Sequence, residues 1–335
     1  DGALYIVDWY KPIIDHGEVD FHHPIRDKTH GRIWKLTKKG SPLLPVVNLK
    51  NASPTTLLHY LKSPEQFTRL QANRAYVEQK GDPALVVEWI KALSASDPAA
   101  AQHRMEGLWL LRALNHYEES LLMASLKALH PRERAAAVRL LAHWQQQQAH
   151  LPVLADLIED EHPQVRLETL HALRKMGGSQ ALSLAMKVLD QPMDDNLEFA
   201  LTLTVSSLKA AWLPGFAKKE NVFDGNVHKQ LYALVAVEDP AVLSPLLQLL
   251  DEPGLNPKLV QKAWVLLAKI GDSETRSKVF QKAVTDEDRR LLNALANAPT
   301  ANDAIPGNLD LLESLLLHDS LPCLLYTSPS PRDKI

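Results

Sequence analysis

The sequence is short of cysteine, of long apolar runs and of basic clusters. Its 335 residues include one cysteine, Cys323, which excludes an internal disulfide, a cysteine-rich metal site and a CxxCH haem-attachment motif within them. No run of about 18 apolar residues occurs, so no membrane span is expected in this stretch. The net charge is −3, and no block of its 37 lysine and arginine residues could follow a phosphate backbone. We therefore expect no nucleic-acid partner.

The overall composition is that of a folded, globular protein. Hydrophobic residues make up 45% of the chain and charged residues 23%, which excludes wholesale disorder. The opening residues, DGALYIVDWY, contain neither an initiator methionine nor a charged and then apolar signal sequence. We interpret them as beginning inside a longer protein.

Two short segments near the start have strand character. Residues 3–9 and 31–37, ALYIVDW and GRIWKLT, are rich in β-branched and aromatic side chains. About twenty residues separate them, whereas a hairpin loop usually has two to five. Two strands alone are marginally stable in water, so we expect the rest of their sheet to lie upstream. Residues 38–54 contain three prolines and are predicted to form a linker.

Beyond the linker the hydrophobic period becomes helical. Val86, Trp89, Ile90 and Leu93 stand at i, i+3, i+4 and i+7, as on one face of an amphipathic helix. The helices also recur: His130-Pro131 stands 32 positions before His162-Pro163. Corresponding arginines follow at intervals of 35, 30 and 32 residues, and they are Arg69, Arg104, Arg134 and Arg166. A period of two helices per unit indicates an α-solenoid.

The repeated pattern resembles the HEAT repeat, especially its short form. Asp, Pro, Val-Arg, an Ala/Leu stripe and Gly follow one another in DEHPQVRLETLHALRKMG, residues 160–177. The tetratricopeptide repeat is the alternative of similar length, but its Trp, Leu-Gly and Tyr signature is not visible. The expected fold is therefore mainly α, a HEAT-like α-solenoid over residues 55–322 preceded by a short antiparallel β remnant.

The last residues differ from everything before them. CLLYTSPSPRD, residues 323–333, resembles a transposase-type sequencing adapter translated in frame. We therefore interpret residues 323–335 as an adapter-derived tail and assign no role to Cys323. A proline-rich disordered tail is the alternative.

The first residues carry a second resemblance. DGALYIVDWY, the Pro12-Ile13-Ile14 step and RDKTHGRIWKLT resemble the close of the β-propeller in a bacterial family of membrane-bound dehydrogenases. In that family a propeller similar to glucose and sorbosone dehydrogenases precedes HEAT-like repeats and often a c-type haem domain. The resemblance implies that residues 1–37 are terminal strands of a truncated propeller and that the parent is periplasmic or exported. It also implies PQQ, calcium and haem c as cofactors of the parent, with none in this fragment.

The loop between the two strands holds the candidate site residues. Histidine and carboxylate side chains are common metal ligands, and His16, His22 and His23 are the candidates for a metal. Asp27 and His30 are the candidates for cofactor or substrate binding because they stand immediately before a strand. Arg32 could instead bind a carboxylate in bidentate fashion. Capping, turn formation and solvated charge are the alternative roles, and for the repeating arginines we expect bridging between repeats.

These observations favour a non-catalytic scaffold. In the first hypothesis the chain is the interaction segment of an exported, quinone-dependent sugar or alcohol dehydrogenase, and the concave face of its solenoid holds a protein domain or a polymeric substrate. In the second it is a HEAT-repeat adaptor with no enzymatic parent. A third makes the histidine loop a hydrolytic metal site. We expect no catalysis from these residues themselves.

Overall fold

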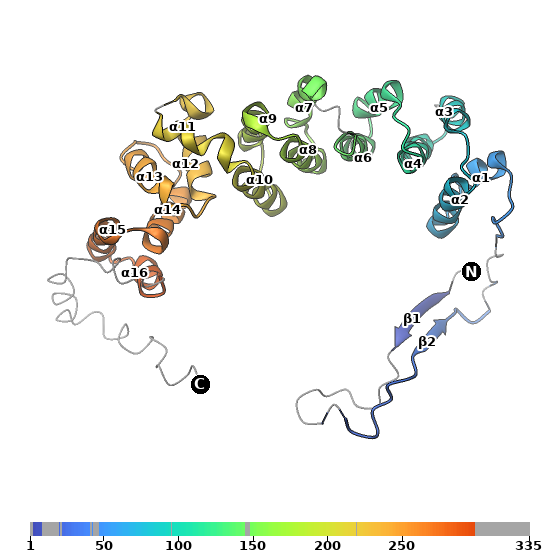
Figure 1. Ribbon diagram of the computed structural model, residues 1–335, viewed down its shortest axis with the longest axis horizontal. Helices are drawn as coiled ribbons and strands as arrows, with labels where there is room; N and C mark the ends of the chain where they lie inside the picture. The colour runs from blue at the N-terminus through green and yellow to red at the C-terminus, as the bar shows by residue number, and fades with distance from the viewer. Residues whose placement is uncertain are drawn as a thin grey trace. The chain divides into compact units, whose positions relative to one another are not determined.

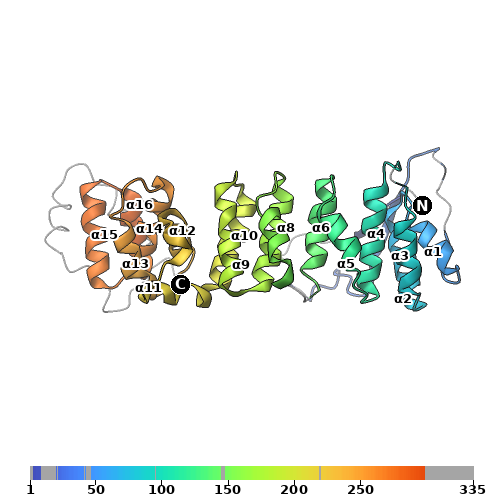
Figure 2. The same cartoon turned by 90° about the horizontal axis from the view of Figure 1, so that it is seen from above.

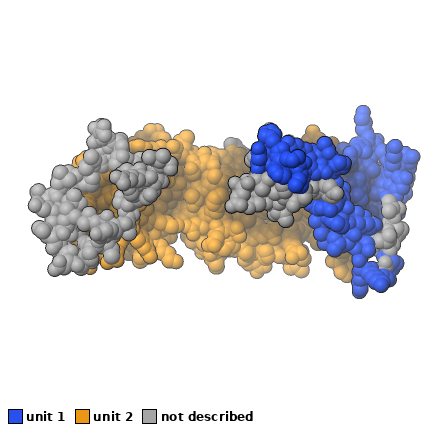
Figure 3. Space-filling model, turned by 90° about the horizontal axis from the view of Figure 1, so that it is seen from below, with its two compact units in different colours: residues 1–93 blue, residues 94–335 orange. Residues whose placement is uncertain are grey.

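A computed structural model describes residues 3–8, 20, 22–40, 42, 47–94, 96–144, 148–218 and 220–298. The chain divides into two compact units, unit 1 in residues 1–93 and unit 2 in residues 94–335, which Figure 3 shows in different colours. The predicted tail, residues 323–335, lies outside the described residues. No helix in the described ranges has the length and apolar character needed to cross a bilayer.

Unit 1 begins with a two-stranded antiparallel ribbon. Strand β1 (Leu4–Asp8) pairs with β2 (Arg32–Leu36), with Leu4 opposite Leu36 and Asp8 opposite Arg32. The two strands predicted from the sequence are confirmed within one residue at each end. Their aliphatic and aromatic side chains are all more than one-third exposed, so nothing in the described structure covers either face of the ribbon.

Three helices complete unit 1, namely α1 (Pro54–Tyr60), α2 (Gln66–Glu78) and α3 (Pro83–Lys91). Proline occupies the first position of α1 and α3, where its missing N–H would have no partner in any case. Ser53 and Asp82 cap these two helices by accepting hydrogen bonds from the backbone N–H groups of Thr56 and Ala84. Helix α1 packs on α2 through its buried leucines.

Unit 2 consists of short helices joined by short turns. Its α-helices are α4 (Ala100–Ala113), α5 (Glu119–Leu126), α6 (Pro131–Leu141), α7 (Leu151–Leu157), α8 (Pro163–Met176), α9 (Gly178–Ala185), α10 (Asp195–Ser207), α11 (Leu213–Ala217), α12 (Val227–Val235), α13 (Leu243–Leu249), α14 (Pro257–Ile270), α15 (Ser273–Thr285) and α16 (Arg289–Ala296). Short 3-10 turns lie at Gln148–His150, Met186–Asp190, Lys209–Ala211, Val222–Gly225 and Pro240–Val242.

The helices of unit 2 form two layers. Each even-numbered helix from α4 to α14 packs on the next even-numbered helix, which makes a continuous row that we call the even layer. Helices α5, α7, α9, α13 and α15 pack on the even layer from one side, and with α11 they form the odd layer (Figure 1). Figure 2 shows the same helices lying side by side along unit 2. This is the stacking of helix pairs predicted from the sequence period.

The recurring His-Pro pairs mark helix starts. His130 and His162 are the N-caps of α6 and α8, and the Nδ1 atom of each accepts a hydrogen bond from a backbone N–H two residues later. The proline that follows occupies the first helical position in both cases. At the other end of α8, Gly177 has a φ of 74°, a conformation that glycine adopts without a steric penalty. The same local rule therefore defines the starts of α6 and α8 in successive repeats.

The repeating arginines hold the turns in front of their helices. In Arg69, Arg134 and Arg166 the Nη1 atom donates to the carbonyl oxygens six and five residues earlier, at distances of 2.7 to 3.1 Å. Arg134 also donates to the carboxylate of Asp160, and Arg166 donates to the carbonyl of Pro192. Both of these partners belong to the following repeat, so the predicted bridging between repeats is confirmed at Arg134 and Arg166.

Arg104 makes a different contact. It donates from Nε and Nη2 to the two carboxylate oxygens of Glu133 on α6, each at 2.8 Å, and Glu133 also accepts from the Ser125 hydroxyl. Glu133 is almost fully buried, and charge-assisted bonds satisfy its carboxylate. The arginine that recurs in the sequence thus has two structural roles. It holds the turn before its own helix at Arg69, Arg134 and Arg166, and it contacts the following repeat at Arg104, Arg134 and Arg166.

Candidate functional site

Asp27 and His30 lie in one compact turn before β2. The Oδ1 atom of Asp27 accepts hydrogen bonds from the backbone N–H groups of Thr29 and His30, at 2.9 and 3.0 Å. Its Oδ2 atom lies 2.7 Å from Nδ1 of His30. The structure therefore brings the two predicted residues together. The contacts described for them are hydrogen bonds within residues 27–30, and these stabilise the turn.

The same contacts lower the pKa of Asp27. The backbone N–H of Thr29 makes the largest contribution, and with the contacts from His30 and the Thr29 hydroxyl it lowers the carboxyl pKa from 3.8 to about 2. Because the pKa is lower in the folded chain, the turn gains stability from the ionised carboxylate above pH 3.8. That gain is lost as the pH falls through about 2.

We expect an acid titration of the Thr29 and His30 amide signals, followed by NMR, to have its midpoint near pH 2. The reason is that both amides donate to the carboxylate that titrates. In an Asp27→Asn variant, which has no carboxyl group, the transition should vanish. A midpoint near 3.8 in the unsubstituted protein would show that the turn does not hold the ionised form.

Arg32 already has a carboxylate partner within its own chain. Its Nε and Nη2 atoms lie 2.9 and 2.8 Å from Oδ2 of Asp8, the residue opposite it in the ribbon. The indole N–H of Trp34 donates to the same oxygen at 3.0 Å, and the guanidinium lies 4.7 Å from the centre of the Trp34 ring. These contacts fix the end of the ribbon. The carboxylate that Arg32 contacts is supplied by β1, and binding of a ligand carboxylate by Arg32 stays a prediction.

The three histidines proposed for a metal are only partly placed. His16 lies outside the described residues. The backbone N–H of His22 donates to Asp20, and Nδ1 of His23 accepts from the backbone N–H of Ile25. Within the described ranges, no three His, Cys, Asp or Glu side chains gather in a group that could hold a metal ion. The metal site therefore stays a prediction.

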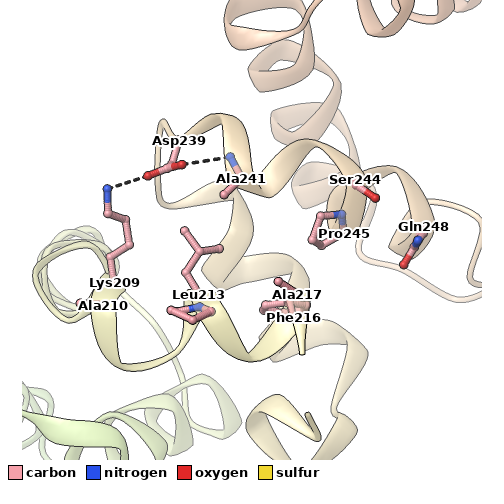
Figure 4. Close-up of a pocket in the computed structure, with 11 residues that line it drawn as sticks. Lys209, Ala210, Leu213, Phe216, Ala217, Asp239, Ala241, Ser244, Pro245 and Gln248 are labelled. Atoms are coloured by element: carbon pink, nitrogen blue, oxygen red, sulfur yellow. Dashed lines mark hydrogen bonds and ion pairs between the residues drawn. The ribbon is translucent and has the colours of Figure 1, made fainter. Parts of the chain in front are cut away.

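Unit 2 contains a groove between α11 and α13, shown in Figure 4. Its volume is about 560 Å³, and the apolar residues Leu213, Phe216 and Pro245 form much of its lining. At one end the Nζ atom of Lys209 lies 2.7 Å from Oδ2 of Asp239, whose other oxygen accepts from the Ala241 N–H. The Lys209 contact is the largest cause lowering the pKa of Asp239. The two charges satisfy each other, so the groove offers apolar contact and no free charge from this pair.

The even layer presents a different surface. Its helices touch even-numbered neighbours on two sides and odd-numbered helices on a third, which leaves one exposed strip along each helix. Matching positions along these strips, separated by 30, 32, 32 and 62 residues, are Trp109, Arg139, His171, Leu203 and Val265. Phe199 stands one turn before Leu203 and is 70% exposed. Large apolar side chains thus lie on the side of the layer that no described helix covers.

Sequence reasoning missed this surface. Phe199 and Leu203 occur in an apolar run, DNLEFALTLTV, in which the side facing the odd layer cannot be separated by residue type from the side facing away. The signal that could have found them is the repeat register itself. Counting 32 residues from Arg139 leads to His171, and counting 32 more leads from these polar residues to Leu203 at the equivalent position in α10.

The family comparison supports the repeat assignment over part of the chain. Residues 118–204 match the family model for HEAT repeats, a stretch that runs from α5 into α10. No curated protein matched the chain. Among solved structures, the crystal structure of YibA from Escherichia coli is similar over 77% of this chain and 100% of that chain, at 14% identity and a TM-score of 0.40. An engineered protein is similar over 78% of this chain and 96% of its own, at 15% identity and a TM-score of 0.24.

The family match rests on the segment in which the helix caps and the arginine contacts recur most regularly. Outside it, the even layer continues through α12, α14 and α16 by the same helix-on-helix packing. The chain is therefore a mainly helical HEAT-repeat protein with a short two-stranded antiparallel sheet.

Proposed function

We propose that this HEAT-repeat chain is a scaffold that binds a protein partner on the exposed strips of its even layer. The observation that carries the proposal is the set of large apolar side chains on those strips. Phe199 and Leu203 are neighbours on α10, and Trp109 and Val265 hold matching positions on α4 and α14; all four are 37% to 70% exposed. Exposed apolar side chains that gather on one face are typical of interaction sites, whereas scattered ones need no explanation. The partner fits the protein domain or polymer expected from the sequence.

Stacked repeats suit this role because they fix a surface without needing a large core. Each helix pair contacts only its neighbours, so side chains on successive even helices stay in register over the whole row. A partner that lies along the row can make contacts on several helices at once, and aromatic anchors such as Phe199 contribute most of the energy in interfaces of this kind.

The proposal predicts that the double substitution Phe199→Asp with Leu203→Asp greatly weakens the binding of peptides selected on the unsubstituted protein. Peptides would be selected from a phage-displayed random library on the unsubstituted protein, and their affinities measured by fluorescence anisotropy. We expect a loss of at least about tenfold, equivalent to about 1.4 kcal/mol, because burying an unpaired carboxylate against an apolar ligand is strongly unfavourable.

Leu129→Asp is the matched control, since Leu129 is 97% exposed and lies outside the even-layer strips. Its variant should bind the same peptides as the unsubstituted protein. Selected peptides that bind the Phe199 and Leu203 variant equally well, or a library from which no peptide is enriched, would refute the proposal. Circular dichroism of each variant checks that unit 2 is folded.

The wider proposal places the scaffold in an exported, dehydrogenase-like protein. Its support is the resemblance of DGALYIVDWY and RDKTHGRIWKLT to a propeller closure, together with the exposed apolar faces of the ribbon that these residues form. Sugar or alcohol oxidation would then belong to residues outside this chain, with PQQ, calcium and haem c bound there. Sequencing the source DNA tests it: propeller blades upstream and a CxxCH segment downstream are expected, and an isolated repeat gene would leave a HEAT adaptor.

A further inference from the structure

Basic side chains gather where α4, α6 and α8 end. The last turns of these three neighbouring helices carry Arg112, Arg139, Arg174 and Lys175. His171 lies one turn before Lys175, and His143 follows the end of α6. We call these six residues the basic strip. Because α6 packs on both α4 and α8, the basic strip is continuous across three repeats.

The electrostatic effects within the strip show how close its members lie. Burial and the charges of Arg112 and Lys175 lower the pKa of His143. Burial, followed by the charges of Arg174 and Lys175, lowers the pKa of His171. Both shifts disfavour the protonated imidazoles, so the permanent charge of the strip rests on four cations that belong to three different helices.

The carboxylates nearby balance these cations only in part. Glu168 accepts two hydrogen bonds from Arg139 and neutralises its charge, and Glu106 stands one turn before Trp109 on α4. Both are at least nine-tenths buried, so neither reaches far over the surface. Arg174 donates to His171, a neutral partner. The basic strip thus presents an excess of positive charge on a chain whose net charge is −3.

An apolar patch lies beside the basic strip. His171 on α8 and Leu203 on α10 hold matching positions on helices that pack together, with Phe199 one turn before Leu203. Helices packed in this way lie about 8–10 Å apart. The distance from α4 to α10 therefore corresponds to about 24–30 Å, which about eight or nine extended residues cover.

We propose that the basic strip and the Phe199–Leu203 patch together bind an acidic segment of a partner protein in which carboxylates are followed by a bulky apolar side chain. The inference rests on the proposed scaffold function and specifies its partner. Charge complementarity argues for the carboxylates, and the exposed Phe199 ring and Leu203 argue for the apolar anchor.

A nucleic acid fits this surface less well. Phosphate backbones are bound by runs of cations that neutralise many successive charges, whereas here four cations are followed by an apolar patch. Helix C-termini also carry a partial negative charge, which weakens the field over the strip. The positive charge that remains over the basic strip matches two or three carboxylates.

The test uses the full chain and a fluorescein-labelled peptide built of Glu-Glu-Leu-Phe units. A second peptide replaces each glutamate with glutamine, and a single-stranded oligothymidylate serves as the nucleic-acid probe. In fluorescence anisotropy we expect the glutamate peptide to bind about tenfold more tightly than the glutamine peptide, with the difference shrinking as salt is added. Arg174→Glu with Lys175→Glu should remove that preference, and so should Arg112→Glu on a different helix.

Lys127→Glu with Lys258→Glu is the matched control, because it changes the net charge equally at exposed lysines outside the basic strip. It should leave the preference intact. Equal binding of the two peptides, or tighter binding of the oligothymidylate, would overturn the inference. If the glutamine peptide binds as well but is lost with Phe199→Asp and Leu203→Asp, the scaffold function stands and only the acidic preference fails; if those substitutions also have no effect, both fail.

Discussion

Replacing Arg166 by alanine should destabilise unit 2 by about 3–5 kcal/mol. Arg166 is 3% exposed, and its terminal nitrogens donate to three backbone carbonyls, those of Asp160, Glu161 and Pro192. In urea unfolding followed by circular dichroism, the midpoint should fall. Hydrogen exchange should speed up first in α8 and α10, because these carbonyls lie in the turns that precede the two helices.

The size of the effect follows from what the truncation leaves behind. Alanine removes all the donors at once, and each buried carbonyl left without a partner costs about 1–3 kcal/mol unless water enters. The Nε atom of Arg166 is itself buried with no acceptor among the described residues, so a small gain offsets part of the loss. The remaining loss of stability weakens the contact between two neighbouring repeats. In a stacked array, the free energy of unfolding depends on such contacts between neighbours.

Arg132→Ala provides the matched comparison. Arg132 lies at the start of α6 and is exposed, and among the described residues the contact it makes is a backbone hydrogen bond to the His130 cap. Its substitution should change stability by no more than about 0.5 kcal/mol. Arg166→Lys should give an intermediate loss, since lysine keeps a charge and three donors but not the planar fork that reaches carbonyls on both sides. Equal midpoints for the Arg166→Ala and Arg132→Ala variants would show that the arginine contacts are incidental.

The repeat fold could be predicted because its signals are local. A proline after a cap residue, an arginine four residues after the cap and a leucine stripe recur at 160–177 and again at 130–144, and each has a direct structural cause at the helix start or in the core. The strands at residues 3–9 and 31–37 were predictable for a similar reason, since their β-branched and aromatic residues suit a pleated surface.

The surfaces were harder to predict because they depend on which sides of a helix remain uncovered. The basic strip draws its cations from three helices about thirty residues apart, and no short motif contains it. Arg32 was difficult for another reason. The sequence indicated a carboxylate ligand, but the partner, Asp8, stands 24 positions earlier and contacts Arg32 only because the strand register places the two residues opposite each other. The pairing of the strands, which residue types alone do not give, supplies the Arg32 side chain with its partner.

Repeat architecture also explains why the two kinds of residue can vary independently. Contacts such as Arg134 with Asp160 lie in the turns between helices, whereas the exposed strips lie along the even helices. Substitutions at strip positions other than Arg139, which bonds Glu168 on the next even helix, therefore leave these turn contacts in place, so binding and stability can be tested separately in the same chain.

Gly81→Ala should have the second large effect, in unit 1. A Cβ atom at this position would lie 2.1 Å from Cε1 and 2.4 Å from Cδ1 of the Tyr76 ring. The ring is fully buried, and its hydroxyl donates to the carbonyl of Asp82 at 2.8 Å. Because the ring is held at both ends, it cannot move aside as a flexible side chain would. We expect a loss of about 3 kcal/mol, at the upper end of the usual range for overpacking.

The backbone around Gly81 makes adjustment harder still. Lys80, two residues after the end of α2, has a φ of 52°, and the Gly81 N–H donates to the carbonyl of Tyr76, which is the six-to-one bond of a Schellman motif. Moving Gly81 away from the ring would break that bond and uncover the end of α2. Hydrogen exchange in residues 66–78, measured by mass spectrometry, is therefore the most direct readout.

Gly31→Ala is the control for the Gly81 substitution. A Cβ atom there would lie 3.8 Å from the Asp8 carbonyl, an ordinary contact, so the change should be within about 0.5 kcal/mol. In a Tyr76→Leu background, where the rigid ring is absent, Gly81→Ala should lose most of its effect, and the two substitutions should couple strongly. Additive effects would mean that the strain lies in the backbone and not against the ring.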